Sequence, residues 1–157
     1  MKHWIIIGLF ILSPVAAWAQ SPAIEKLFDR YGAAEGVTSV MLERKMMQMM
    51  SAQAAQRGDA ELARLLDEIV FIRVLTTTDE TDLAAEAEQA VKASKHFELL
   101  TSASVDGRIT RVYLRDSKLN ENKELVVITR GEDETAVVHI CGSFDVHEVS
   151  RITSLRP

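Results

Sequence analysis

The sequence has few of the residues that build cross-linked or linker-joined proteins. One cysteine, Cys141, and three prolines occur among its 157 residues, and aromatic residues make up 6%. A single cysteine cannot form an internal disulfide, so the folded chain has to gain its stability from packing. No proline lies between Pro22 and Pro157, and no repeat or Gly/Pro-rich linker interrupts the chain. These absences favour one compact domain.

The common signatures of catalysis and of nucleic-acid binding are also missing. No G-x-S-x-G, P-loop, G-x-G-x-x-G or H-E-x-x-H pattern occurs. The formal net charge is −5, and a net acidic chain lacks the clustered cations that nucleic acids and anionic membranes require. We therefore predict a protein that is not an enzyme, has no cofactor and binds no nucleic acid.

The first twenty residues contain the longest apolar run. Lys2 supplies a positive start, an apolar stretch follows from Trp4 to Leu12, and Ala17 and Ala19 form a small-x-small cleavage pattern. We predict a signal peptide over residues 1–19, cleaved after Ala19, rather than an uncleaved anchor. The run is shorter than the roughly 20 residues that span a bilayer, and no lipobox cysteine follows it. The mature domain, residues 20–157, is therefore expected to be periplasmic or secreted, without stable membrane insertion.

Hydrophobic periodicity divides the mature chain into helices and strands. It predicts helices over residues 23–32, 44–57, 60–68, 78–97 and 144–155, and strands over residues 36–43, 69–77, 97–105, 108–116, 123–130 and 135–143. The strand at 69–77 is almost wholly apolar, as expected for a central strand buried on both faces. Asp106-Gly107 between two strands is a strong hairpin signal. Asp145 with Glu148 predicts the start of the last helix.

This order predicts an α+β fold with a single mixed sheet. The first half suggests β-α-β-α-β crossovers, and the second half an antiparallel four-strand meander. The long helices are expected on one face of the sheet, with a short C-terminal helix at the end.

The first candidate site is a cluster of methionines at residues 46–50. On a helix, Met46, Met47, Met49, Met50 and Ala54 fall within an arc of about 160°, which is typical of a face packed against a core. Two alternatives stay open. Met46, Met49 and Met50 are spaced so that their thioethers could converge on Cu(I), or the methionines form an exposed, adaptable surface for a partner.

Two further groups of residues have spacing that could support chemistry. His139 and Cys141 are two positions apart on one strand, so their side chains share a face. We expect them to pack in the core. The alternatives are that Cys141 is the nucleophile of a hydrolase with His139 as its base, or that both are metal ligands. Arg111, Tyr113 and Arg115 also share a strand face. This row predicts either the exposed side of a sheet covered on one face or a strip that binds an anion or a peptide.

Three stretches together resemble a known family. They are FDRYGAAEGVTSVMLERKMMQMM, HFELLTSASVDGRITRVYLRDS and ELVVITRGEDETAVVHICGSFDVHEVSRI, and they are similar to the bacterial exported family called domain of unknown function 4252. In that family a Val-x-x-Val strand leads into a Lys-and-Met helix, a Tyr-Glu-Leu-like strand follows, and a Gly-x-hydrophobic-Asp-hydrophobic motif ends the domain. The matching residues are Val37, Val40, Lys45, Met46, Met49 and Met50, then Phe97, Glu98 and Leu100, and finally Gly142, Phe144, Asp145 and Val146.

The resemblance implies a single exported α+β domain and assigns no catalytic residue. Some members are encoded beside genes for extracytoplasmic sigma factors, which implies a link to envelope signalling. We therefore expect a non-catalytic binding module of the cell envelope with an envelope protein as its partner. The alternatives are a periplasmic Cu(I)-binding protein that uses Met46, Met49 and Met50, and a hydrolase that uses Cys141 and His139.

Overall fold

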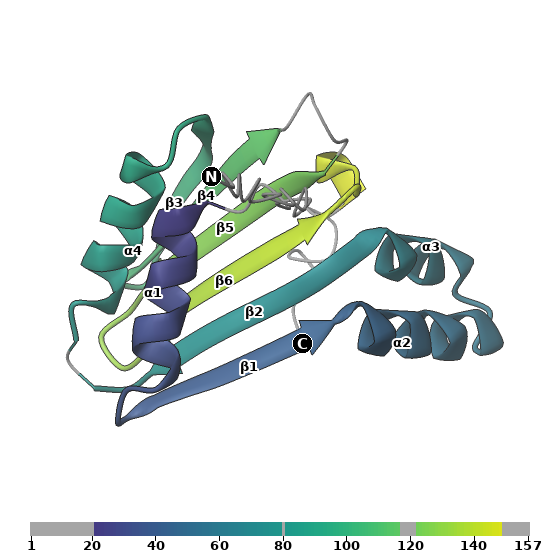
Figure 1. Ribbon diagram of the computed structural model, residues 1–157, viewed down its shortest axis with the longest axis horizontal. Helices are drawn as coiled ribbons and strands as arrows, with labels where there is room; N and C mark the ends of the chain where they lie inside the picture. Colours follow the sequence, from purple (N-terminus) through teal and green to yellow (C-terminus); the bar gives the residue numbers. More distant parts are fainter. Residues whose placement is uncertain (1–20, 80, 117–121, 149–157) are drawn as a thin grey trace, which may run out of the picture.

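The fold is a single six-stranded sheet with two helices on one face and a helical hairpin at one end (Figure 1). The computed structural model describes residues 21–79, 81–116 and 122–148. The strand order is β1-β2-β6-β5-β4-β3. The strands are β1 (Val37–Glu43), β2 (Ile69–Thr77), β3 (Phe97–Val105), β4 (Arg108–Asp116), β5 (Lys123–Arg130) and β6 (Thr135–Gly142). The predicted α+β class with one sheet is confirmed.

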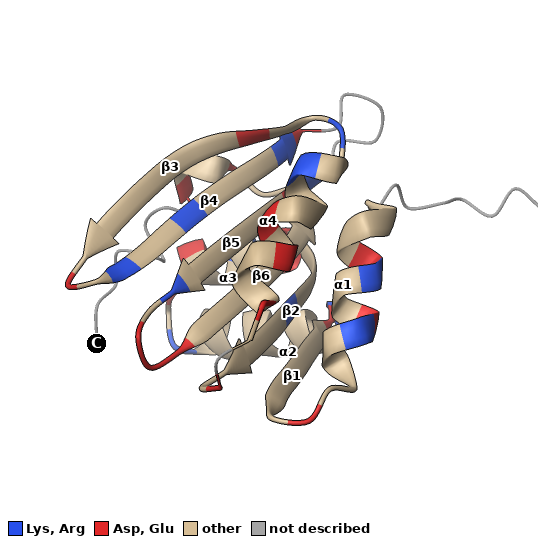
Figure 2. Ribbon diagram, turned by 90° about the vertical axis from the view of Figure 1, so that its left-hand side faces the viewer, with Lys and Arg blue, Asp and Glu red and all other residues tan. Residues whose placement is uncertain are grey.

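The two helices on the sheet are α1 (Pro22–Gly32) and α4 (Leu83–Ala93), which lie on the same side of it (Figure 2). Each buries the face that its periodicity predicts. In α1 these are Ile24, Leu27, Phe28 and Tyr31, and in α4 they are Leu83, Ala87, Ala90 and Val91. The two helices pack with the β2, β5 and β6 side chains beneath them into one hydrophobic cluster. We call this side of the sheet the helix face.

Every strand pairing is antiparallel, so the predicted mixed sheet is wrong in this respect. Between β1 and β2 the chain forms α2 (Arg44–Gln56) and α3 (Ala60–Glu68). These helices form a hairpin that extends past the end of the sheet (Figure 1). The hairpin returns the chain to the end of the sheet where β1 stops, so β2 runs back antiparallel to β1. A crossover helix would instead have carried the chain to the other end of the sheet and made the two strands parallel. Consequently α2 does not lie on a sheet face with α1 and α4.

The turn between β3 and β4 has the conformation that its sequence predicts. Asp106 and Gly107 have φ angles of 50° and 77°, as a two-residue turn with left-handed central residues requires. α4 begins at Leu83, later than predicted. The N–H of Asp79 bonds the Thr77 side chain at 3.1 Å, which fixes residues 77–79 in a non-helical conformation.

The chain leaves β6 through the residues that match the last family motif. A Cβ on Gly142 would clash with the Glu68 carbonyl oxygen, so this approach of β6 to the end of α3 requires glycine. Phe144 is fully buried. The Asp145 carboxylate accepts the N–H of His147 at 2.9 Å, which confirms its predicted position at the start of a helical turn. The rest of the predicted terminal helix, the signal peptide at 1–19 and residues 117–121 lie outside the described residues.

The second side of the sheet, here called the open face, carries three cross-strand rows across β1, β2, β6, β5 and β4, together with Glu98 of β3, which stands opposite Leu114. The leucine row is Leu42, Ile72, Ile140, Leu125 and Leu114; the valine row is Val40, Val74, Val138, Val127 and Val112; the threonine row is Thr38, Thr76, Ala136, Thr129 and Thr110. Residues that stand opposite each other on neighbouring strands point to the same side. The predicted burial of β2 on both faces is therefore wrong: Leu75 on the helix face is buried, but Ile72 and Val74 on the open face are only half-buried.

Candidate functional site

The methionines of α2 divide between the protein interior and the surface. Met47 is fully buried, whereas Met46, Met49 and Met50 are 44%, 55% and 38% exposed. Ser51 lies on the buried side with Met47, where its hydroxyl donates to the Ala63 carbonyl of α3 at 2.8 Å. The expected burial of Met46 and Met50 is therefore wrong. We call the exposed side chains of Met46, Met49 and Met50 the methionine surface.

The position of α2 explains this division. The buried residues Met47, Ser51 and Ala54 form a stripe about 60° wide at ~100° per residue, and the exposed methionines are centred roughly 110° around the helix from it. Because α2 lies beyond the end of the sheet (Figure 1), neighbours reach only that stripe. The apolar arc of the helix is thus wider than the surface that the fold covers.

The charges of α2 are all positive. Arg44 and Lys45 occupy its first turn, Arg57 follows its last residue, and no acidic residue lies between them. Cations at a helix N-terminus oppose the helix dipole. The residue before the helix, Glu43, makes no side-chain capping bond. The charges of Arg44 and Lys45 therefore do not stabilise the start of α2.

His139 and Cys141 lie on the helix face of β6, and their expected packing in the core is confirmed by their burial. The His139 ring lies between the rings of Phe28 and Phe71, with centroid distances of 5.8 and 5.2 Å. Burial first, and then the negative charge of Glu124, raise the pKa of the Cys141 thiol to about 11. Because the thiolate is the reactive form of cysteine, this environment works against a nucleophilic role.

Arg111, Tyr113 and Arg115 lie on the helix face of β4, beneath α4, rather than on an exposed side of the sheet. The Arg111 guanidinium pairs with Glu88 of α4 at 2.9 Å, and the Tyr113 hydroxyl donates to the same carboxylate. Burial, followed by the effect of Glu88, raises the pKa of Tyr113 to about 12. Arg115 pairs with Glu124. The row thus contacts acidic residues of the protein and helps to hold α4 on the sheet.

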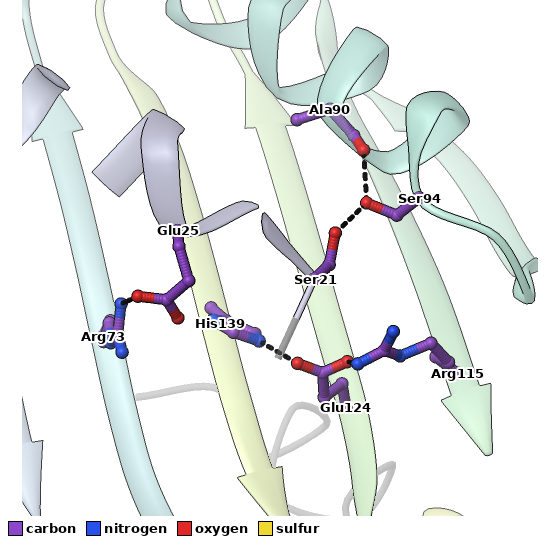
Figure 3. Close-up of polar contacts among 8 residues, drawn as sticks. All are labelled: Ser21, Glu25, Arg73, Ala90, Ser94, Arg115, Glu124 and His139. Atoms are coloured by element: carbon purple, nitrogen blue, oxygen red, sulfur yellow. Dashed lines mark hydrogen bonds and ion pairs between the residues drawn. The ribbon is translucent and has the colours of Figure 1, made fainter. Parts of the chain in front are cut away.

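Glu124 is the centre of a buried polar cluster that sequence reasoning missed (Figure 3). One of its oxygens lies 3.2 Å from His139 Nε2, and the other pairs with Arg115. Nearby, Arg73 of β2 pairs with Glu25 of α1 at 2.8 Å. Arg73 is the single charge of the largely apolar strand β2, and Glu124 directly precedes the apolar run Leu125–Ile128 of β5. That pattern was the available signal, because a charge inside such a strand requires a partner.

The described residues contain neither a metal-binding cluster of His, Cys, Asp and Glu side chains nor a membrane-spanning helix. Within residues 21–79, 81–116 and 122–148, no three His, Cys, Asp or Glu side chains come together as metal ligands. No helix in the same ranges is long and apolar enough to cross a membrane. A cleft of about 740 Å³ lies among the turns at the end of the sheet opposite α2 and α3. Its charges are those of Asp79, Asp82, Arg130, Glu132 and Glu134.

Comparison with known proteins identifies the family but adds no characterised relative. Neither the curated proteins nor the solved structures gave a match to the chain. The family model described as Domain of unknown function (DUF4252) matches residues 31–152. This range contains α2, β1–β6 and the Gly142-x-Phe144-Asp145 motif. The chain therefore belongs to the DUF4252 family.

Proposed function

We propose that this domain is a non-catalytic binding module of the bacterial cell envelope, and that it docks a partner protein through the methionine surface of α2. The observation that carries this proposal is the exposure of Met46, Met49 and Met50 on a helix that extends from the body. Location in the periplasm rests on the predicted signal peptide, and a link to envelope signalling rests on the family resemblance.

Burial of the methionine surface supplies useful binding free energy. Covering a fully exposed methionine contributes about 1.5–3 kcal/mol. Three side chains that are about half exposed therefore contribute roughly 1 kcal/mol each, or about 3 kcal/mol together. Methionine is unbranched and polarizable, so the same surface can adapt to partners of different shape.

The charges of α2 indicate the kind of partner. Arg44, Lys45 and Arg57 give this helix three positive charges and no negative one. An amphipathic helix with acidic residues beside its apolar stripe is complementary to this arrangement. The apolar stripe would cover the methionines, and the acidic residues would approach the cations at the two ends of α2.

Cu(I) binding is the second candidate, and it depends on the same three side chains. Met46, Met49 and Met50 are separated by three and four positions on one helix, so their side chains are neighbours. Their exposure leaves the thioether sulfurs accessible, and thioethers are suitable Cu(I) ligands. The nearby cations Arg44 and Lys45 disfavour a bound cation but favour an acidic peptide. We therefore place protein docking first.

Two triple variants separate these candidates. Replacing Met46, Met49 and Met50 by leucine keeps an apolar surface and removes sulfur, whereas replacing them by glutamine removes both. Each change preserves good helix propensity. If a protein docks, the leucine variant keeps binding and the glutamine variant loses it. If Cu(I) is the ligand, both variants lose stoichiometric uptake in a Cu(I) titration.

The docked protein is identified by photocrosslinking in cells that export the chain. A photoreactive residue at position 49 is expected to give a discrete crosslinked partner that disappears when Met46 and Met50 are glutamine. Position 48, on the other side of α2, is the matched control. Equal crosslinking from the two positions would end the docking proposal. Intact-mass measurement of the exported chain tests its location, with Gln20 expected as the first residue.

A further inference from the structure

We infer that the methionine surface is a site of reversible oxidation: a peroxide converts Met46, Met49 and Met50 to methionine sulfoxide, and the partner then no longer docks. The loss of docking rests on the proposed function, whereas the oxidation of these side chains does not. The observation that carries the inference is that one helix, α2, exposes three thioethers and buries a fourth, that of Met47.

Exposure makes the methionine surface reactive. Met46, Met49 and Met50 lie on the part of the chain that extends past the end of the sheet, so an oxidant can approach them from solvent (Figure 1). Met47 is 0% exposed and packs in the cluster that contains Phe144. Because an oxidant has to reach the sulfur atom, oxidation is expected to distinguish neighbours in the sequence: Met46 reacts and Met47 is protected.

The reaction is an oxygen transfer to sulfur. A lone pair on the thioether sulfur attacks one oxygen of hydrogen peroxide, the O–O bond breaks, and an S–O bond forms. The sulfur loses two electrons and the peroxide gains them. The second oxygen leaves as water after taking up the proton of the transferred oxygen. The reverse step consumes two thiols of a methionine sulfoxide reductase, which form a disulfide and release the oxygen as water.

The other sulfur-bearing side chains among the described residues differ in reactivity. Peroxides attack the thiolate form of cysteine. Burial and then the charge of Glu124 raise the pKa of the Cys141 thiol to about 11, so little thiolate is present at neutral pH. Met41 of β1 is 50% exposed and is expected to react, but it does not lie on α2. It therefore serves as a reference for oxidation outside the methionine surface.

Oxidation removes the property that suits these side chains to docking. A sulfoxide is polar, whereas a thioether is apolar. Covering the three apolar side chains is expected to strengthen docking about a hundredfold. A partner that has to cover three sulfoxides would lose that gain, so its affinity is expected to fall by about the same factor.

The division of α2 keeps the oxidised protein folded. Met47, Ser51 and Ala54 form its buried side, and oxidation of the exposed side leaves them unchanged. A polar group at an exposed helix position changes stability little, so the oxidised chain is expected to have a Tm within about 5 °C of the untreated one. From such a folded chain a reductase can recover the form that docks.

The first test is peptide mapping by mass spectrometry after the exported chain has been treated with hydrogen peroxide. Met46, Met49 and Met50 are each expected to gain one oxygen at least about tenfold faster than Met47, and to lose it when methionine sulfoxide reductases are added. Treatment in concentrated urea, where Met47 is exposed too, should abolish the difference. Equal rates in the folded chain, or sulfoxides that the reductases do not reduce, would overturn the inference.

The second test measures docking before and after oxidation. A photoreactive residue replaces Gln53, which is exposed and lies one turn after Met49 on the same side of α2, so the three methionines stay in place. Purified chain, treated with peroxide or untreated, is added to envelope extract and irradiated. The crosslink to the partner should disappear after peroxide treatment and return after reduction.

The triple leucine variant of the methionine surface is the matched control, because it keeps Met41 and Met47 but has no thioether to oxidise on that surface. Its crosslink should survive peroxide. A crosslink that persists when the wild type carries all three sulfoxides, or one that peroxide abolishes in both chains, would overturn the switch and leave the docking proposal standing. An untreated wild type that gives no crosslink would remove the proposed function and with it the switch, whereas the peptide map would still decide the site of oxidation.

Discussion

Glu124 is the carboxylate at the centre of the buried cluster, so Glu124→Gln is the most informative single substitution. The Glu124 side chain is 5% exposed, and its partners His139 and Arg115 are 0% and 17% exposed. Glutamine has nearly the same shape but no negative charge. Arg115 would lose its carboxylate partner in a largely buried position, where a positive charge is costly to retain.

The expected loss can be bounded from the geometry. Removing one partner of a buried ion pair costs about 3–5 kcal/mol. The Arg115 guanidinium also lies 5.5 Å from the centre of the Phe97 ring, which retains part of its stabilisation. We therefore expect the lower bound, about 3 kcal/mol, equivalent to a fall in Tm of roughly 10 °C. The assay is equilibrium unfolding in urea, with an unchanged m value as evidence that the two folded states are equally compact.

Glu86→Gln is the matched control. It also removes a carboxylate from an ion pair with an arginine, here 2.9 Å from Arg30, but in that pair Arg30 and Glu86 are 70% and 25% exposed. Solvent-exposed pairs contribute less than about 1 kcal/mol. Equal losses in the two variants, or a loss below about 1 kcal/mol for Glu124→Gln, would refute the reasoning that burial makes the Glu124 cluster stabilising.

Two further predictions concern single buried side chains. Met47→Ala should lower the free energy of unfolding by about 2–5 kcal/mol, because it leaves a cavity in the core. Met49→Ala leaves no cavity and should lower it by less than about 1 kcal/mol. Similar losses for the two variants in urea unfolding would show that the assignment of the buried and exposed sides of α2 is wrong. The pKa of Cys141 is raised from 9.0 to about 11 on folding. The stability linked to this thiol is thus fully present below pH 9 and is lost as the pH rises to 11, because the unfolded chain releases its proton first. Stability should fall by about 2–3 kcal/mol more in the wild type than in Cys141→Ala over that range, and parallel pH profiles would contradict this.

The features that the sequence predicted correctly are local ones. The buried faces of α1 and α4 follow from a 3.6-residue period, and the turn at Asp106-Gly107 follows from the conformations that those two residues tolerate. Each of these depends on residues close together in the chain. The same is true of Asp145, whose side chain bonds an N–H two residues away.

The pairing of strands could not be predicted in the same way. The valine row joins residues 40, 74, 112, 127 and 138, and no local pattern relates these positions. The hairpin of α2 and α3 decides that β1 and β2 are antiparallel, and its direction depends on packing between the two helices. The partners of Glu124 were hidden for the same reason, because Arg115 and His139 lie on the two neighbouring strands.

The two failures about burial have one physical cause. Periodicity reports how much apolar surface an element has, but not how much of it the rest of the chain can cover. β2 is apolar on both faces and α2 has a wide apolar arc, so full burial was the natural prediction for each. The fold covers Leu75 and Met47 but leaves Val74 half-buried and Met49 exposed. An apolar surface that a fold does not need for its own core is a candidate for contact with another molecule. The methionine surface is such an excess, and the cations of α2 beside it suit an acidic partner.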